Sequence, residues 1–420
     1  MISPAHPRWP TRLTALVSLG AAAAVVLLLV ACGSDVRARA ATEITGARVG
    51  RPIPSGFLGL SIEIKSLEQY AGSDPAALDP VFLRLIEQIA PGQSPVLRFG
   101  GDSTDWSWWP VAGMKQPPGI RYTLTPTWIS VARALAAQLH AKLILGVNLE
   151  ADSAKLASVE ARAMVSGIGR GAIAALELGN EPELYGVLGW YHTKSGRQIR
   201  GRPRSYDLAD FISQYTQFAR RMPAVPLAGP SSGAPTWLSM LGRFLSAEPR
   251  VRLVTVHAYP LKHCTKSTVV TIPQLLSESS SHGLAQLLAP YLEAAARAGA
   301  PLRVDEMNGI SCGGTKRVSN SFASALWVLD TLFELARAGV SGVNIHTVPG
   351  TTNEILGPAR VAGQWQMRVH PEYYGMIMFA QATPPGSRLL ALRSPAPAGV
   401  KIWATRARDG AIHVVVINKR

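Results

Sequence analysis

The 420-residue chain is short of cysteine, with three, and of acidic residues, with 27 Asp and Glu against 42 Lys and Arg. So few cysteines exclude a disulfide-stapled miniature fold and a cysteine-rich metal cluster. No zinc-finger spacing, P-loop or RNP-like motif accompanies the basic excess, so nucleic acid is not an expected partner. The net charge of +15 is instead compatible with an anionic lipid surface or an acidic substrate. With 47% hydrophobic residues, the chain can bury the core of one large domain, alone or with a small one.

The first thirty-odd residues predict an export signal of the lipoprotein type. A basic start leads into an apolar run at 13–30, which ends in Val30-Ala31-Cys32-Gly33. This order is typical of a signal peptide at 1–31, and its ending resembles a bacterial lipobox in which Cys32 is lipidated. A retained transmembrane anchor is the alternative. Either way the remaining chain is expected outside the cytoplasm, in the cell envelope through the lipid on Cys32 or secreted.

From about residue 55 the chain alternates short apolar runs with longer amphipathic stretches. Eight runs have the length and composition of strands: Phe57–Ile64, Val96–Phe99, Leu143–Asn148, Ile173–Leu178, Val225–Gly229, Leu253–Ala258, Leu302–Asp305 and Val343–His346. Between them, apolar residues three and four apart predict helices: Pro80–Ala90, Pro126–His140, Ser153–Ser166, Tyr206–Arg221, Leu284–Ala300 and Ser319–Ala338. Eight such units predict a (β/α)₈ TIM barrel over 55–383. A doubly wound open sheet is the alternative, but no glycine-rich dinucleotide loop follows the first run.

The end of the chain, 384–420, has a different pattern. Three strands separated by Pro, Gly or Asp turns are predicted at Arg388–Leu392, Gly399–Arg406 and Ala411–Ile417. They indicate part of an all-β sandwich module beside the barrel. Three strands rarely bury a core alone, so either 42–53 and the neighbouring barrel surface complete the module, or the module is incomplete. Residues 32–54 are interpreted as a linker with a first β segment.

Two predicted barrel strands end in glutamate. The fourth is followed by Gly179-Asn180-Glu181-Pro182, and the seventh runs into Asp305-Glu306-Met307. The C-terminal ends of barrel strands open on one mouth, where functional residues gather. Two carboxyl groups facing one pocket suit glycosidic bond cleavage, in which one protonates the leaving oxygen and the other attacks the anomeric carbon or activates water. The alternative is that each glutamate forms a structural ion pair with an arginine of the barrel, such as Arg98 or Arg303.

Seven segments carry a resemblance to a known family: Phe57–Glu63, Leu97–Asp102, Leu176–Pro182, Val256–Tyr259, Ser311–Gly314, Ser321–Trp327 and Pro371–Tyr374. Asn180-Glu181-Pro182 and the later glutamate resemble the large clan of retaining barrel glycosidases. Together the segments resemble, over about residues 55–420, glycoside hydrolase family 79, the β-glucuronidase and heparanase group. The resemblance implies a retaining reaction on β-linked glucuronic acid in glycosides or acidic oligosaccharides.

The resemblance also implies roles for individual residues. Glu181 would be the general acid/base and Glu306 the nucleophile, with Tyr259 orienting Glu306 by a hydrogen bond. The expected contacts with the terminal sugar come from six further residues: Asn180, Glu63 and Asp102 to its hydroxyls, and the backbone N–H groups of Gly313 and Gly314 with the hydroxyl of Tyr373 to its carboxylate. The alternative for the glycine pair is a flexible turn. No metal or organic cofactor is implied, because the two carboxylates suffice.

Cys264 and Cys312 are an even pair in an exported chain, so a disulfide is expected, with two separate thiols as the alternative. Cys312 stands where the heparanase branch has an aromatic residue, and the bridge would brace the loop of the glycine pair. Basic residues gather in the loops expected at the mouth: Lys194, Arg197, Arg200, Arg202, Arg204, Lys262, His263, Lys266, Lys316 and Arg317. They would attract an acidic saccharide, or be ordinary solvated charges.

Two other functions remain open at this stage. A relative could cleave another β-glycoside, or act inside a polymer rather than at its end. The chain could also be a catalytically silent surface lipoprotein that binds anionic polysaccharide. Both glutamate positions are filled, which favours an enzyme.

Overall fold

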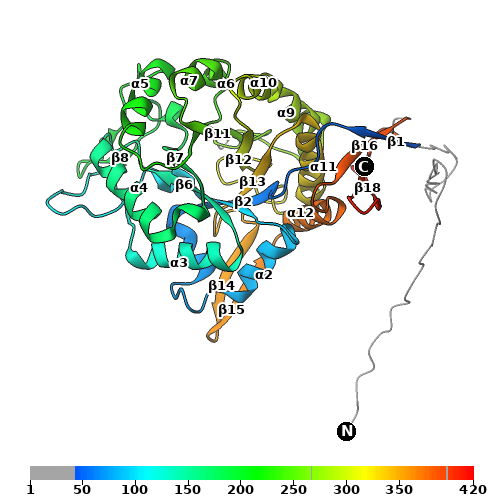
Figure 1. Cartoon of the computed structure of the whole chain (residues 1–420), viewed down its shortest axis with the longest axis horizontal. Helices are drawn as coiled ribbons and strands as arrows, with labels where there is room; N and C mark the ends of the chain where they lie inside the picture. Colours follow the sequence, from blue (N-terminus) through cyan, green and yellow to red (C-terminus); the bar gives the residue numbers. More distant parts are fainter. Residues whose placement is uncertain (1–42, 266, 394–395) are drawn as a thin grey trace, which may run out of the picture.

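The structure, a computed structural model, describes residues 43–265, 267–393 and 396–420 (Figure 1). The predicted signal peptide at 1–31 and the predicted lipidation site Cys32 lie outside this part of the chain. Within the described residues, no helix combines the length and the apolar composition that a membrane crossing requires.

Eight parallel strands close a barrel at the centre of the molecule (Figure 1). In spatial order they are β2 (Leu58–Glu63), β3 (Val96–Gly100), β6 (Lys142–Val147), β7 (Ile173–Leu178), β10 (Leu227–Ser232), β11 (Val251–Ala258), β12 (Leu302–Met307) and β13 (Gly342–Thr347). The last strand pairs with the first, with Val343 opposite Leu58. Each of the eight predicted runs contributes one barrel strand, so the predicted (β/α)₈ fold is confirmed.

The longer helices surround the barrel, because one face of each is apolar and packs on the strands. They are α2 (Pro80–Ile89), α3 (Pro126–Gln138), α4 (Ala154–Ile168), α5 (Leu208–Ala219), α10 (Ala289–Arg297), α11 (Phe322–Ala338) and α12 (Pro371–Ala382). Shorter helices lie between them: α1 (Leu67–Ala71), α6 (Pro235–Leu238), α7 (Leu241–Ala247), α8 (Ile272–Leu275) and α9 (His282–Leu287). The single helix predicted over 284–300 is instead α9 followed by α10, because Pro290 cannot continue a helix but fits its first turn.

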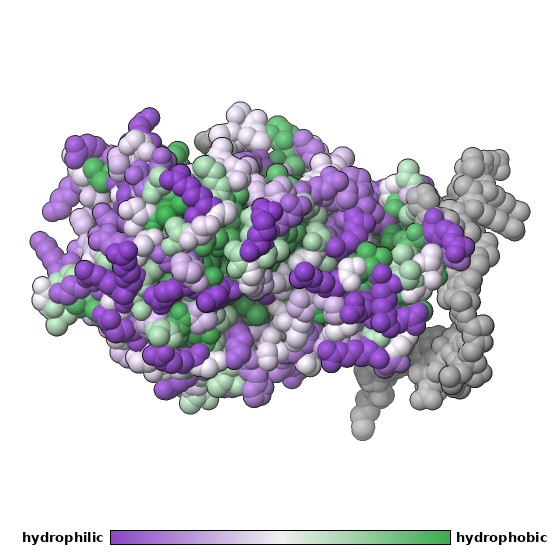
Figure 2. Space-filling model, turned by 45° about the horizontal axis from the view of Figure 1, so that its top comes forward, coloured by the Kyte–Doolittle hydropathy of each residue, from purple (hydrophilic) through white to green (hydrophobic). Residues whose placement is uncertain are grey.

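Three short two-stranded sheets lie in the loops that follow the barrel strands β3, β7 and β13. They pair β4 (Ser107–Trp108) with β5 (Tyr122–Thr123), β8 (Tyr191–His192) with β9 (Gln198–Ile199), and β14 (Leu356–Val361) with β15 (Gln364–Val369). On the face shown in Figure 2, hydrophilic side chains predominate and apolar ones form small scattered groups. The apolar core is therefore covered on this face.

A four-stranded antiparallel sheet lies beside the barrel, next to α11 and α12 (Figure 1). Its order is β1 (Ile44–Val49), β16 (Arg388–Leu392), β17 (Val400–Arg406) and β18 (Ile412–Asn418). The segment 42–53, one of the two possibilities for completing the module, does supply its fourth strand. The inner face of the sheet packs on helices rather than on a second sheet.

Trp403 fixes this sheet to the barrel. Its ring stacks on Phe333 of α11 at 5.2 Å between ring centroids, and its Nε1–H donates to Oδ1 of buried Asp330 at 2.9 Å. The other oxygen of Asp330 pairs with Lys419 at 2.6 Å. Helix α11 thus contacts β17 through Trp403 and the residue after β18 through Lys419, by apolar and charged contacts.

We expect Trp403→Ala to lower the free energy of unfolding by about 3–5 kcal/mol, because it empties a packed site and leaves a buried carboxylate oxygen without its donor. Chemical denaturation measures this change. The control is Val416→Ala on the outer side of β18, where the side chain is 37% exposed and about 0.5 kcal/mol or less should be lost. Equal, small losses in the two variants would contradict the role of Trp403.

Candidate active site

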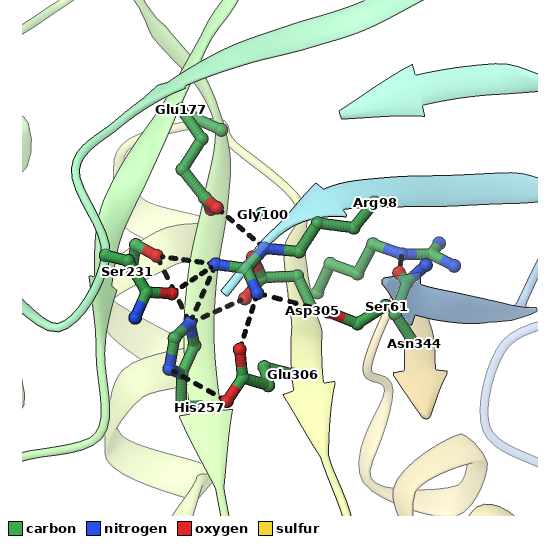
Figure 3. A network of polar contacts seen from close by, with 12 residues as sticks. Ser61, Arg98, Gly100, Glu177, Ser231, His257, Asp305, Glu306 and Asn344 are labelled. Atoms are coloured by element: carbon green, nitrogen blue, oxygen red, sulfur yellow. Dashed lines mark hydrogen bonds and ion pairs between the residues drawn. The ribbon is translucent and has the colours of Figure 1, made fainter. Parts of the chain in front are cut away.

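The buried guanidinium of Arg98 on β3 is at the centre of a polar network in the barrel mouth (Figure 3). It forms ion pairs with Glu177 at 2.7 Å, with Asp305 at 3.0 Å and with Glu306 at 2.6 Å. Further hydrogen bonds run from its two Nη atoms to Ser61, Asn180 and Ser231. The five N–H donors of an arginine are thereby all used.

Two glycines of the Arg-Phe-Gly-Gly segment make room for this network. A Cβ on Gly100 would lie 2.7 Å from Cζ of Arg98, so only a glycine fits beside the guanidinium. Gly101 has φ +68° and a Cβ there would lie 2.4 Å from Oε1 of Glu63. Gly100 and Gly101 therefore leave the space that the side chains of Arg98 and Glu63, respectively, occupy.

Glu306 is held as a carboxylate. Its Oε2 accepts from Arg98 at 2.6 Å, and its Oε1 accepts from the hydroxyl of Tyr259 at 2.8 Å. Burial by itself raises the pKa of Glu306, but His346, His257 and Arg98 together with the Tyr259 hydrogen bond lower it below the usual range. The hydrogen bond expected between Tyr259 and Glu306 is present.

Glu181 approaches the same space from the end of β7. It has φ +45°, a left-handed backbone that costs a residue with a Cβ roughly 1–2 kcal/mol, and its N–H donates to the carbonyl of Ser231 at 2.9 Å. This turn aims the side chain across the mouth, where it is 24% exposed. Carboxylate oxygens of Glu181 and Glu306 lie within 4.8 Å of one another.

His257 on β11 connects the two glutamates. Its Nδ1 lies 3.0 Å from Oε1 of Glu181 and 3.9 Å from Oε1 of Glu306, and its Nε2 lies 3.1 Å from Oγ of Ser231. Burial would lower the pKa of His257, but Glu306 and the hydrogen bond to Glu181 raise it to about 10. At neutral pH the ring is therefore an imidazolium that donates to Glu181 and Ser231.

The sequence did not reveal His257 or the full role of Arg98. Arg98 was recognised only as a partner for one of the glutamates, and it does pair with Glu306. His257 stands two residues before Tyr259 and so points to the same side of the strand. That spacing was the available signal for it.

Three residues expected to contact sugar hydroxyls lie beside the glutamates. Glu63 accepts from the N–H of Ser103 at 2.8 Å, and Nδ2 of Asn180 faces Oδ1 of Asp102 at 3.5 Å. Asp102 is open to the mouth on one side. Desolvation by the surrounding protein and the charges of Glu63 and Glu181 raise its pKa to about 8.

The glycine pair lies in a loop that the Cys264–Cys312 disulfide joins to the loop after β11, and the expected bridge is confirmed. Gly313 and Gly314 have φ +81° and +77°. The N–H of Gly314 donates to Ser311 within the turn at 3.4 Å. Within the described residues the N–H of Gly313 has no backbone or side-chain acceptor, so Gly313 is the available donor of the two.

Tyr373 is not part of this site, which corrects the expectation from the sequence. It lies in the first turn of α12 with 1% exposure, and its hydroxyl donates to the carbonyl of Leu85 at 2.7 Å, with Oε1 of Gln88 at 3.1 Å. Both partners belong to α2, outside the barrel. The buried side of α12 takes Tyr373 into the contact between the two helices, whereas the neighbouring Tyr374 is exposed.

The basic residues expected around the mouth divide into two groups. Arg202 is buried, where it donates to the carbonyls of Leu149 and Glu150 and so supports the loop after β6. Exposed members in the loops after β7, β11 and β12 are Lys194, Arg197, Arg204, Lys262, Lys316 and Arg317. Arg200 and His263 are half-buried, and Lys266 lies outside the described residues, so the exposed and half-buried members are available to an acidic ligand.

Glu181, His257 and Glu306 are close enough to ligate one metal ion. Their chemistry fits a cation poorly, because Arg98 already lies 2.6 Å from Glu306 and His257 holds protons on both nitrogens. The arrangement suits proton transfer between the glutamates and a bound molecule.

We expect the free energy of unfolding to fall as pH rises from about 6.5, the unfolded-state pKa of histidine, to about 10, the pKa of folded His257. Because the pKa of His257 is higher in the folded chain than in the unfolded chain, protonation of this histidine stabilises the folded state fully below about pH 6.5. This stabilisation is lost as the pH rises to about 10. Denaturant unfolding at several pH values should give a shallower fall for His257→Gln than for the native chain. His192→Gln, at an exposed histidine, should keep the native slope. Parallel slopes for His257→Gln and the native chain would refute the imidazolium.

No protein-family model matches the chain. The sequence is similar to a β-glucuronidase of Neurospora crassa, with 23% identity over 382 residues, covering 80% of this chain and 65% of that protein. The chain therefore spans a little under two thirds of the length of this relative. Among solved structures, it resembles a 4-O-α-L-rhamnosyl-β-D-glucuronidase from Fusarium oxysporum 12S, with TM-score 0.59, 17% identity, and coverage of 86% of this chain and 80% of that one.

A second solved structure with this fold is CelM2, a bifunctional glucanase-xylanase protein from a metagenome library. It gives a TM-score of 0.55 and 15% identity, covering 88% of this chain and 86% of that chain. A β-xylosidase of glycoside hydrolase family 39 from Caulobacter crescentus gives a TM-score of 0.52 and 17% identity, covering 87% and 78%. At these identities the likeness establishes the fold, a barrel of the kind that these glycosidases share.

Proposed function

We propose that the protein is a retaining glycoside hydrolase that cleaves β-linked glucuronic acid from glycosides or acidic glycans. The observation that carries this proposal is the pair Glu181 and Glu306, whose carboxylate oxygens lie within 4.8 Å across the barrel mouth. Retaining glycosidases have their two carboxyl groups about 5–5.5 Å apart, and inverting enzymes about 6.5–9.5 Å. A separation of this order favours direct attack by Glu306 over activation of a water.

In the proposed reaction, Glu306 attacks the anomeric carbon while Glu181 protonates the leaving oxygen. Arg98 and Tyr259 hold Glu306 ionised and fix both of its oxygens, which keeps it ready as a nucleophile. After the leaving group departs, Glu181 accepts a proton from a water molecule, whose oxygen attacks the anomeric carbon; the bond between this carbon and Glu306 breaks, and Glu306 leaves as a carboxylate. His257 fixes the orientation of Glu181 through both steps.

Three features support glucuronic acid as the sugar. The N–H of Gly313 is available for its carboxylate, and Lys316 and Arg317 are exposed on the same loop, which the disulfide braces. The resemblance of the motifs to family 79 points the same way. So do the N. crassa relative and the F. oxysporum structure, which are a β-glucuronidase and a rhamnosyl-glucuronidase.

Export with a lipid on Cys32 belongs to the same proposal. It is supported by the apolar run at 13–30, the residues around Cys32, and the disulfide expected of an oxidising compartment. Such a location would place the enzyme where it meets glycans outside the cytoplasm.

We expect the chain to release 4-nitrophenol from 4-nitrophenyl β-D-glucuronide and much less from the matching glucoside and galactoside. Glu306→Gln should lower kcat by about a thousandfold or more, because the amide cannot act as the nucleophile. Glu87→Gln, at an exposed position on α2, is the matched control and should keep the native rate. A native rate in Glu306→Gln, from protein with an unchanged melting temperature, would remove this residue as the nucleophile.

The stereochemistry of the product gives an independent prediction. Because two displacements restore the configuration, β-glucuronic acid should appear first and the α-anomer only later by mutarotation. Proton NMR during the first minutes of hydrolysis distinguishes the two anomers. Early α-anomer would show inversion and reject the covalent intermediate.

A further inference from the structure

A second hollow opens beside Glu181, between the loops that follow β3, β6 and β7. We call it the acidic pocket, because it is lined by the carboxyl groups of Asp102, Asp105, Glu150 and Glu181, with the loop 184–190 as its outer wall. Its cavity volume is about 90 Å³ and its outer side is open, so part of a bound sugar would remain in contact with solvent.

Two carboxyl groups in this pocket differ in their hydrogen bonds. Asp105 is saturated, since it accepts from the backbone of Leu149, Glu150 and Asn180 and from the hydroxyl of Tyr185. The carboxyl group of Glu150 has no hydrogen-bond or ion-pair partner in the described part of the chain, although the residue is only 8% exposed. Its oxygens are not fully enclosed and reach the pocket, so they are available to bond a ligand or water.

The backbone around Glu150 directs its side chain to the pocket. Its carboxyl group packs against Gly201, where a Cβ would lie 2.3 Å from Oε1. Behind it, Arg202 donates to the carbonyls of Glu150 and Leu149 and so fixes the loop. Because the backbone of Gly201 closes one side of the Glu150 carboxyl group, this group faces the acidic pocket on the other side.

The position of the pocket relative to the two glutamates indicates which part of a substrate it meets. Glu181 lines the pocket, whereas Glu306 does not. In the proposed reaction the glucuronic acid lies over Glu306, and Glu181 contacts the oxygen of the bond being cleaved. Asp102 and Asn180, which are expected beside the glucuronic acid, also line the pocket. The part that extends past Glu181 to Glu150 and Trp190 therefore adjoins the unit that leaves.

The charge of the pocket restricts what can bind there. Burial and the nearby Asp105 raise the pKa of Glu150 to about 9, and the pKa of Asp102 is raised to about 8. Four carboxyl groups line the pocket, whereas the nearby guanidinium groups of Arg202 and Arg121 offset the rise in the pKa of Glu150 only in part. The pocket therefore disfavours additional negative charge, and a carboxylate or sulfate should bind there less well than a hydroxyl. A sugar hydroxyl, in contrast, can both donate to and accept from such carboxyl groups.

We propose that the acidic pocket binds the sugar that leaves and selects a hydroxyl-bearing, uncharged sugar over an acidic one, with Glu150 as its specificity-determining residue. This inference rests on the proposed function and names the class of unit attached to the glucuronic acid. The basic loops near the mouth act at longer range and can still draw in a glycan that carries acid groups elsewhere.

Two disaccharides that differ at one carbon test the proposal. They are β-D-glucuronosyl-(1→4)-glucose and β-D-glucuronosyl-(1→4)-glucuronic acid, compared with 4-nitrophenyl β-D-glucuronide using the full native chain. We expect kcat/KM to be at least about tenfold higher for the disaccharide that ends in glucose. Glu150→Met, which keeps the length of the side chain and removes both oxygens, should reduce that ratio about tenfold.

Controls separate binding from folding. Glu87→Met, the same change at an exposed site, should keep the native ratio, and Glu150→Gln should give an intermediate ratio because an amide still bonds a hydroxyl. If Glu150→Met fails to fold, the proposal is tested by the ratio of kcat/KM for the two disaccharides in the native chain and in Glu150→Gln. Cleavage of both disaccharides at equal kcat/KM by the native chain, or native ratios in the folded Glu150 variants, would overturn this inference alone. No cleavage of any glucuronide would overturn the proposed function and the inference with it.

Discussion

The saturated guanidinium of Arg98 is the constraint on which the site depends. Its partners are on β2, β10 and β12, near the end of β7 and in the turn that follows β7, so only a closed barrel brings them within reach of one side chain. A buried arginine facing three carboxylates is tolerable because every N–H finds an acceptor. The same saturation fixes Glu306 and Asn180 before any substrate arrives, which is the preorganisation that catalysis by positioned groups requires.

Within this frame the two glutamates have opposite surroundings. Glu306 is enclosed by Arg98, His257, His346 and the Tyr259 hydroxyl, which all favour its negative charge. Glu181 is on the outer side of the mouth, where a left-handed turn holds it away from Arg98 and His257 is its hydrogen-bond partner. A carboxylate fixed inside and a more accessible carboxyl group outside suit a nucleophile and a proton donor, respectively.

Much of this was readable from the sequence, because strands buried on both faces are short apolar runs and polar residues at their ends stand out. This pattern in the sequence was enough to predict all eight barrel strands and the positions of Glu181 and Glu306 at strand ends. It could not locate Arg98 at the centre, since its neighbours come from strands distant in sequence and only the closed register brings them together. Tyr373 was misplaced because a helix residue in a family-like segment gives no indication of which neighbour it faces. Pro290 did carry a local signal for the break between α9 and α10, which the apolar periodicity of 284–300 concealed.

The mouth is also polarised across the barrel. In the order of strands, β12 stands directly opposite β6, four places away in either direction. The loop after β12 carries Gly313, Lys316 and Arg317, and the loop after β6 carries Glu150 with its unpartnered carboxyl group. The loop after β7, beside β6, adds the exposed Lys194, Arg197 and Arg204, so the axis is defined close to the cleaved bond by Glu150 and Gly313 rather than by the whole rim. Close to that bond, a substrate with an acid group at one end and an uncharged sugar at the other is favoured in one direction. Reversal would bring its carboxylate against Glu150 and Asp102 and leave the basic loop without a partner, so the charge pattern orients the bond to be cleaved between Glu306 and Glu181.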